Sequence, residues 1–186
     1  MNLQQYLEHF ERILNSPKPE APYDAPDYFN YAKLNWSRMN RWFKKGNLTD
    51  ETKSIVKGIT MDQKWILIAE PWCGDAAHLV PFIIMMAREN ENIHLEIELR
   101  DSEPFRIEQY LTNGGKSIPK LIVKDVKGND LFTWGPRPAN CQAHFEDLKA
   151  KNLTFEEQKI ELQNWYNHDD GQSVQKELNA LLKSYN

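Results

Sequence analysis

Cys73 lies at the expected start of a helix, a position that can make a thiol reactive. Cys73 follows the short apolar run Trp65–Ala69 and comes just before a long apolar segment that predicts a helix. The dipole and free amides at the start of a helix favour thiolate over thiol, whereas the carboxylate of Asp75 opposes them. We therefore expect a modest net lowering of the Cys73 pKa. The alternative is a cysteine that has no role.

The composition excludes several classes of function. The chain has 186 residues and a net charge of −4, which argues against a nucleic-acid binder because phosphate binding needs a concentrated basic face. No apolar run reaches the roughly 20 residues of a membrane span, and the first residues lack the pattern of a secretion signal. We therefore expect a cytoplasmic protein. Two cysteines without suitably spaced histidines predict no disulfide framework, no metal site and no cofactor.

The apolar pattern predicts helices at both ends of the chain. Residues 1–60 form a helical N-terminal extension, because apolar stripes at helical spacing are separated by breaks at Ser16–Pro19 and Gly46. Residues 153–186 are helical again and begin with a capping box made by Thr154 and Glu157. We expect both ends to pack on the region between them.

Residues 61–152 alternate between strand and helix patterns. Asp101–Leu111 predicts a short helix, and other helices are expected from Ala76 to about Arg88 and after Pro138. Four strands are expected, at Trp65–Ala69, Ile93–Leu99, Leu121–Val123 and Leu131–Trp134. This order predicts an α/β fold with a mixed sheet flanked by helices.

Four sequence features between about residue 63 and 151 recur together in one known family. They are the turn Trp72-Cys73-Gly74-Asp75, Pro81 in the expected helix after it, Ile118-Pro119 at the start of a strand, and Gly135. These features resemble the thioredoxin superfamily, and the layout resembles its bacterial members that carry a helical N-terminal extension. The resemblance implies a thioredoxin fold with a catalytic thiol at Cys73 and a substrate groove that includes Gly135. It also implies a cis Ile118–Pro119 bond that leaves the preceding backbone free to pair with an extended substrate, whereas the alternative is an ordinary trans proline that opens an edge strand.

Two departures from the family pattern restrict the chemistry. Ala76 stands where the resemblance places a second, resolving cysteine, and Leu67 replaces the buried aspartate that assists proton transfer. A mixed disulfide on Cys73 would then wait for an outside thiol. Cys141 is a candidate resolving thiol, because the resemblance puts it on the same side of the fold. Its alternative is a small buried hydrophobic residue.

The expected substrate site surrounds Cys73. Trp72 and Trp134 are candidates for an apolar rim, or else partly buried aromatic residues, and His78 is expected to be a surface or packing residue. Further candidates for substrate binding are Gly74, Asp75, Ile118, Pro119 and Gly135. Candidates for receiving a carboxylate, or else charges of the solvated surface, are Lys116, Lys120 and Arg137.

Two functional hypotheses follow. The first is a cytoplasmic monothiol thioredoxin-like protein, whose partners are proteins or glutathione-type thiols and disulfides. The second is a redox-inactive thioredoxin-fold module that binds proteins through the same groove. The reactivity of Cys73 distinguishes them, and the oligomeric state stays open.

Overall fold

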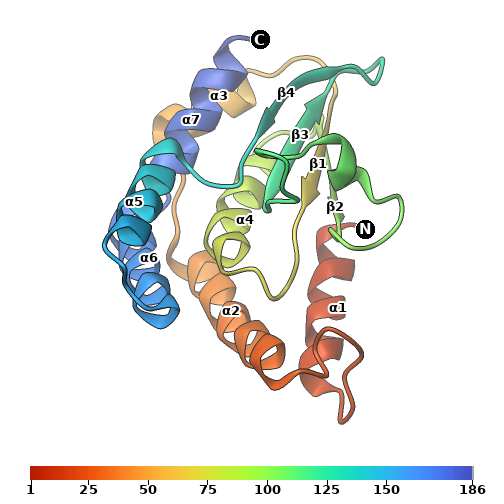
Figure 1. Ribbon diagram of the computed structural model, residues 1–186. Coiled ribbons are helices and arrows are strands. Elements are labelled where there is room, and N and C mark those ends of the chain that lie inside the picture. Colours follow the sequence, from red (N-terminus) through yellow and green to blue (C-terminus); the bar gives the residue numbers. More distant parts are fainter. Residues whose placement is uncertain (186) are drawn as a thin grey trace.

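A four-stranded sheet forms the centre of the computed structural model, which describes residues 1–185 (Figure 1). The strand order is β2-β1-β3-β4. β2 runs parallel to β1, whereas β3 is antiparallel to β1 and β4 is antiparallel to β3. The strands are β1 (Gln63–Ile68), β2 (Ile93–Glu98), β3 (Lys120–Lys124) and β4 (Asp130–Trp134). The predicted mixed sheet is confirmed.

Helices flank this sheet, and those at the two ends of the chain agree with the predicted extensions. The capping box of Thr154 and Glu157 at the start of α6 is confirmed. The helices are α1 (Leu3–Asn15), α2 (Pro26–Lys45), α3 (Asp50–Lys57), α4 (Gly74–Ala87), α5 (Ala139–Ala150), α6 (Phe155–Asp169) and α7 (Gln172–Lys183). Within the described residues, no helix is both long and apolar enough to cross a membrane.

The predicted helix over Asp101–Leu111 is wrong in extent. Only one 3₁₀ turn forms there, η1 (Arg106–Gln109). Pro104 supplies no backbone N–H to a helix, and Phe105 has a φ of 52°, in the left-handed region. A regular helix cannot run through these two residues.

The order of the strands explains why β2 carries polar residues. β2 lies at one edge of the sheet, with Ile93 and Ile97 buried and His94 exposed. The first residue of the chain covers part of this edge: the amino group of Met1 donates to the carbonyl oxygen of Ile97 at 2.8 Å, and the Ile97 amide donates to Met1. The N-terminal extension therefore protects an edge strand.

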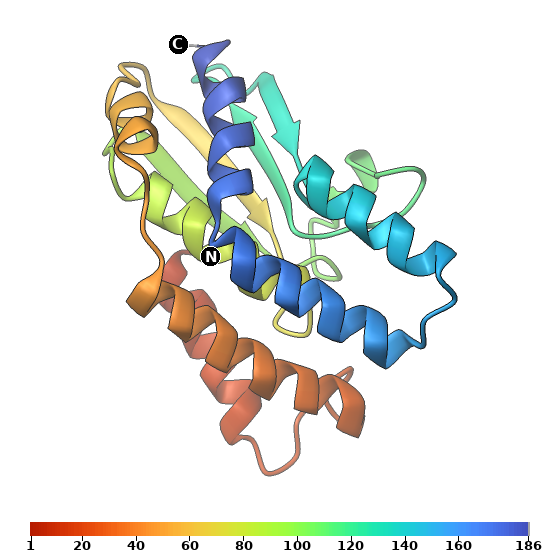
Figure 2. The ribbon, with the colours of Figure 1, turned by 90° about the vertical axis from the view of Figure 1, so that its left-hand side faces the viewer.

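The N-terminal and C-terminal helices meet beside α4. α2 packs on α4, where the rings of Trp42 and Phe82 lie 5.3 Å apart. Figure 2 shows α2 and α6 side by side. Arg41 of α2 donates to Oδ1 of Asn167 of α6 at 2.6 Å, and Lys159 of α6 contacts the hydroxyl of Tyr31. The two ends of the chain thus enclose the helix that follows Cys73.

One hydrophobic core runs through all three predicted regions. It includes Tyr6 and Phe10 of α1, Trp65 of β1 and Leu178 of α7, each at most 1% exposed. The predicted boundaries at residues 60/61 and 152/153 fall in the connections between α3 and β1 and between α5 and α6. The division into three regions stays a prediction.

Candidate functional site

Cys73 caps the amino end of α4, as the sequence predicts. Its backbone is extended, with φ −81° and ψ 116°, and its sulfur accepts from the Ala76 amide at 3.5 Å. Its thiol donates to the carbonyl oxygen of Ile118 at 3.4 Å. The turn before it is closed by the Cys73 amide, which donates to the Glu70 carbonyl oxygen at 3.0 Å. The thiol is therefore held between a helix amide and the backbone that precedes Pro119.

The expected lowering of the Cys73 pKa is wrong. Cys73 is only 7% exposed, and burial, followed by the charge of Asp75, raises its pKa to about 12. The Ala76 amide and Arg137 act in the opposite direction but do not compensate. The helix start gives the sulfur a favourable amide, yet loss of water penalises the thiolate more. In this conformation Cys73 is a protonated thiol at neutral pH.

Asp75 is held on two sides by residues from distant segments. Nη2 of Arg137 lies 2.7 Å from Oδ2 of Asp75, and the hydroxyl of Tyr166 donates to Oδ1 at 2.8 Å. Both charged side chains are mostly buried, with 16% and 12% exposed. Arg137 was expected to receive a partner's carboxylate, but here it binds the protein's own. The hydrogen bond from Tyr166 to Asp75 could not be predicted from the local sequence pattern of α6.

Ile118, Pro119 and Gly135, the residues of the expected groove, meet beside Cys73. The Ile118–Pro119 peptide bond is cis. Gly135 has a φ of 115°, and an added Cβ there would lie 2.2 Å from the carbonyl oxygen of Pro119. Only glycine fits this close approach of two backbone segments. The structure therefore brings together the three groove residues that the sequence singles out.

The two lysines expected near this groove have partners inside the protein. Nζ of Lys120 donates to Oγ1 of Thr112 at 2.6 Å and to the carbonyl oxygen of Gly135 at 3.2 Å. Lys116 forms an ion pair with Glu108 at 2.8 Å. Lys120 thus braces the groove loop, and neither lysine is a free cation.

The two tryptophans of the expected rim differ. Trp134 is 6% exposed, and its Nε1 donates to Oε2 of Glu177 in α7 at 2.7 Å. It is packed under the C-terminal helix and does not form an open rim, because α7 supplies both cover and a partner for its N–H. Trp72 is half-buried. The ring of Tyr28 meets it edge-on at 5.8 Å, and the guanidinium of Arg100 lies 4.6 Å above it.

The N-terminal extension holds the turn through Asn35. Asn35 is 1% exposed, and its Nδ2 donates to the carbonyl oxygen of Pro71 at 3.0 Å. Its Oδ1 accepts from Nη1 of Arg38 at 3.0 Å. The contact of Asn35 with the turn could not be predicted from the sequence, because the two lie 36 residues apart.

Cys141 is fully buried in α5. Burial raises its pKa to about 12, although a hydrogen bond with Tyr166 acts in the opposite direction. Both cysteines are free thiols. Cys141 has the environment of a small buried hydrophobic residue, and its role as a resolving thiol stays a prediction.

His78 is a packing residue. It is 3% exposed, accepts from Nε1 of Trp42 at 2.9 Å and stacks on Tyr166 with ring centres 4.4 Å apart. Burial, together with the charges of Arg38 and Arg41, lowers its pKa to about 3. The neutral imidazole of His78 thus joins α4 to α2 through Trp42 and to α6 through Tyr166.

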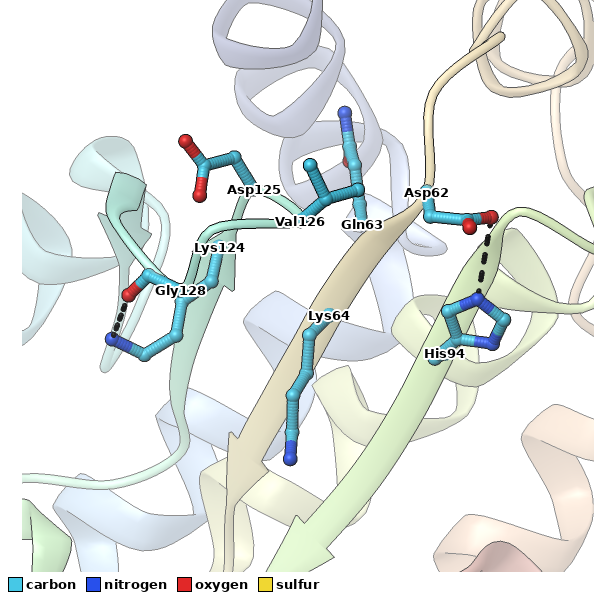
Figure 3. A pocket seen from close by; sticks show the side chains of 8 residues that line it. All are labelled: Asp62, Gln63, Lys64, His94, Lys124, Asp125, Val126 and Gly128. Carbon is cyan, nitrogen blue, oxygen red and sulfur yellow. Dashed lines mark hydrogen bonds and ion pairs between the residues drawn. The ribbon is translucent and has the colours of Figure 1, made fainter.

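A shallow pocket lies at the other end of the sheet (Figure 3). It encloses about 190 Å³ at the start of β1, where Asp62 pairs with His94 at 3.4 Å. β1 leads away from this pocket towards Cys73. Among residues 1–185 no group of three or more histidine, cysteine or acidic side chains is arranged to hold a metal ion.

Comparisons with known proteins agree with this geometry. A family model described as thioredoxin matches residues 23–149. A solved structure of a protein of unknown function from Pseudomonas aeruginosa has a TM-score of 0.62 at 16% identity, covering 85% of this chain and 92% of that one. An HIV epitope scaffold has a TM-score of 0.59 at 17% identity, covering 84% and 91%.

No curated protein sequence matches the chain. The solved structures are too distant in sequence to indicate more than a shared fold, whereas the family model covers more than half of the chain. The turn at Cys73, the groove at Pro119 and Gly135, and the mixed sheet that supports them lie within that match. The chain belongs to the thioredoxin family.

Proposed function

We propose that this protein is a monothiol thioredoxin-like protein of the cytoplasm, in which Cys73 forms mixed disulfides with proteins or glutathione-type compounds. The observation that carries the proposal is the 3.4 Å approach of the Cys73 sulfur to the carbonyl oxygen of Ile118. This approach sets the thiol against the backbone segment to which an extended disulfide partner would pair. A disulfide bound along that segment would lie next to the sulfur.

The reaction has two steps. The Cys73 thiolate attacks one sulfur of the partner disulfide, that S–S bond breaks, and the other sulfur leaves as a thiolate that takes up a proton. A second thiolate, supplied by an outside thiol, then attacks the mixed disulfide and restores Cys73. Ala76 supplies no thiol for this second step, and Cys141 is fully buried. The outside thiol therefore performs the release.

Burial sets the rate of the first step. With a pKa of about 12, about one Cys73 in 10⁵ is a thiolate at pH 7. A thiolate of high pKa is a strong nucleophile once formed, so the reaction is slow and accelerates with pH. An event that admits water to the turn, such as partner binding, would increase the thiolate fraction.

The same burial favours a second candidate, a redox-inactive module that binds proteins through the groove. The module needs Pro119 and Gly135 but no reactive sulfur. In this case Cys73 is a packing residue, as its 7% exposure allows. The two candidates differ in what happens to the sulfur and not in the fold.

The test is incubation of the folded protein with glutathione disulfide at pH 8.5, followed by intact-mass measurement. We expect the wild type and the Cys141→Ser variant to gain one glutathione, and the Cys73→Ser variant to gain none. An adduct that forms only after unfolding by denaturant would contradict the monothiol proposal and favour the second candidate, the redox-inactive binding module. The denatured sample also shows that the thiol was intact.

A further inference from the structure

Two neighbouring arginines of α2, of which Arg38 lies beside the turn, have no carboxylate partner among the described residues. Arg38 and Arg41 are half-buried on α2, and neither forms an ion pair within residues 1–185. Arg38 donates to Asn35, and Arg41 donates to Asn167. Nε of Arg41 is buried without any hydrogen-bond partner. The guanidinium of Arg41 also lies 4.5 Å over the ring of Trp42, so both arginines contact neutral groups and no acidic one in the described part of the chain.

Burial and a neighbouring cation both disfavour the charged form of Arg38. Burial and the neighbouring charge of Arg41 lower the pKa of Arg38 to about 10. A guanidinium presents a planar fork of donors that matches a carboxylate. Arg38, which has no such partner among the described residues, is therefore suited to an anion that the protein itself does not supply.

Arg38 faces open space next to Cys73. An added Cβ at Gly74 would lie 3.9 Å from Nη1 of Arg38. No other heavy atom of the described residues comes within 4 Å of that point, apart from the chain neighbours of Gly74 and the backbone of α4. The free amides of the first turn of α4 add a positive dipole end at the same place. Asp75 does not fill it, because Arg137 and Tyr166 already hold its carboxylate.

We propose that Arg38 binds the carboxylate of a small thiol compound of the glutathione type whose sulfur meets Cys73. This inference rests on the proposed function, since it names the class of small partner. Gly74 directly follows Cys73, so a ligand carboxylate beside it must lie only a few bonds from the reacting sulfur. Glutathione meets this condition because its terminal carboxylate follows its cysteine by one residue.

The test uses a protein that cannot react. In the Cys73→Ser background, binding of S-methylglutathione is measured by calorimetry or by amide shifts of Gly74. We expect Arg38→Gln to weaken binding about tenfold, the size expected for a lost charge-assisted hydrogen bond. Arg38→Lys should retain part of the affinity. The matched control is Lys45→Gln, which removes an equal charge from the exposed end of the same helix and should change nothing.

A second ligand identifies the group that Arg38 contacts. In the protein that retains Arg38, the glycine ethyl ester of S-methylglutathione should bind about tenfold more weakly than the free acid. The Arg38→Gln substitution should not weaken binding of the ester any further. Equal affinities for the free acid with and without the Arg38→Gln substitution, or no binding of the free acid, would overturn the inference. Because the Cys73→Ser background makes no disulfide at this position, these outcomes are independent of whether Cys73 reacts.

Discussion

The thiol of Cys73 donates a hydrogen bond to the carbonyl oxygen of Ile118 across 3.4 Å. This carbonyl is a poor neighbour for a thiolate, because its oxygen carries partial negative charge. The Ala76 amide, 3.5 Å from the sulfur on the other side, would favour a thiolate. The two backbone groups therefore act in opposite directions on one proton, and burial decides in favour of the thiol.

The alkylation rate of Cys73 should rise about tenfold for each pH unit between pH 7 and 10, without a plateau. The reason is a pKa that burial raises to about 12, so every unit of pH below that value multiplies the thiolate fraction by ten. The measurement is iodoacetamide labelling of the folded Cys141→Ala variant, read by mass. A plateau near pH 7 or 8 would show an activated thiolate and contradict the structure.

Replacing Asp75 by asparagine should make Cys73 more reactive while making the protein less stable. The Asp75 charge raises the pKa of Cys73, so its loss lowers that pKa and should speed alkylation at pH 8 severalfold. The same change leaves the mostly buried Arg137 without its carboxylate, at a cost of about 3 kcal/mol in unfolding free energy. Alkylation rates and urea denaturation measure the two effects. Asp147→Asn, on the exposed face of α5, is the control, and an unchanged alkylation rate in Asp75→Asn would contradict the role of this charge.

The Ala76→Cys variant should form a disulfide within the turn. Residues 73 and 76 are three apart on the first turn of α4 and share a face, and the Ala76 amide already lies 3.5 Å from the Cys73 sulfur. We expect loss of two free thiols on mild oxidation and slow reduction of insulin with dithiothreitol. Leu67 keeps the rate low, because position 67 supplies no carboxylate to assist deprotonation of the second thiol. The wild type, tested in parallel, should show no catalytic turnover. Two thiols that stay unpaired in a folded variant would refute the placement of Cys73.

Gly135→Ala should destabilise the protein by more than about 3 kcal/mol. The new Cβ would lie 2.2 Å from the backbone oxygen of Pro119, and φ at this position is 115°. Gly114→Ala is the control for backbone conformation alone, because φ there is 77° with no atom within 4 Å of the added Cβ. It should cost about 1 kcal/mol. Equal losses in thermal or urea unfolding for the two variants would contradict the close approach of the groove segments.

The positions of the strands and of Cys73 could be predicted because local patterns determine them. A short apolar run followed by a break predicts β1, and the start of an apolar helix places Cys73 at its cap. The partners of Asp75 could not be predicted in this way. Tyr166 lies 91 residues further along the chain, and only the packing of α6 brings it to the turn. Packing of the C-terminal helices is also why Trp134 bonds to Glu177 and not to a partner at an open rim.

The sign of the Cys73 pKa shift could not be predicted from the residues near it in the chain. The sequence indicates the helix amide and Asp75, which are both near in the chain and opposite in effect. It does not indicate how much water reaches the sulfur, because that depends on segments distant in the chain, such as the backbone of Ile118. Burial turned out to be the largest influence on this pKa.

The lifetime of the glutathione adduct on Cys73 separates monothiol chemistry from both an inert thiol and a dithiol pair. The folded protein is loaded with glutathione disulfide at pH 8.5, freed of small molecules and followed by intact mass. We expect one adduct, on Cys73, that persists until glutathione or dithiothreitol is added and then disappears. No adduct on the folded protein, or an adduct that is lost spontaneously as Cys73 and Cys141 become joined, would contradict the monothiol proposal.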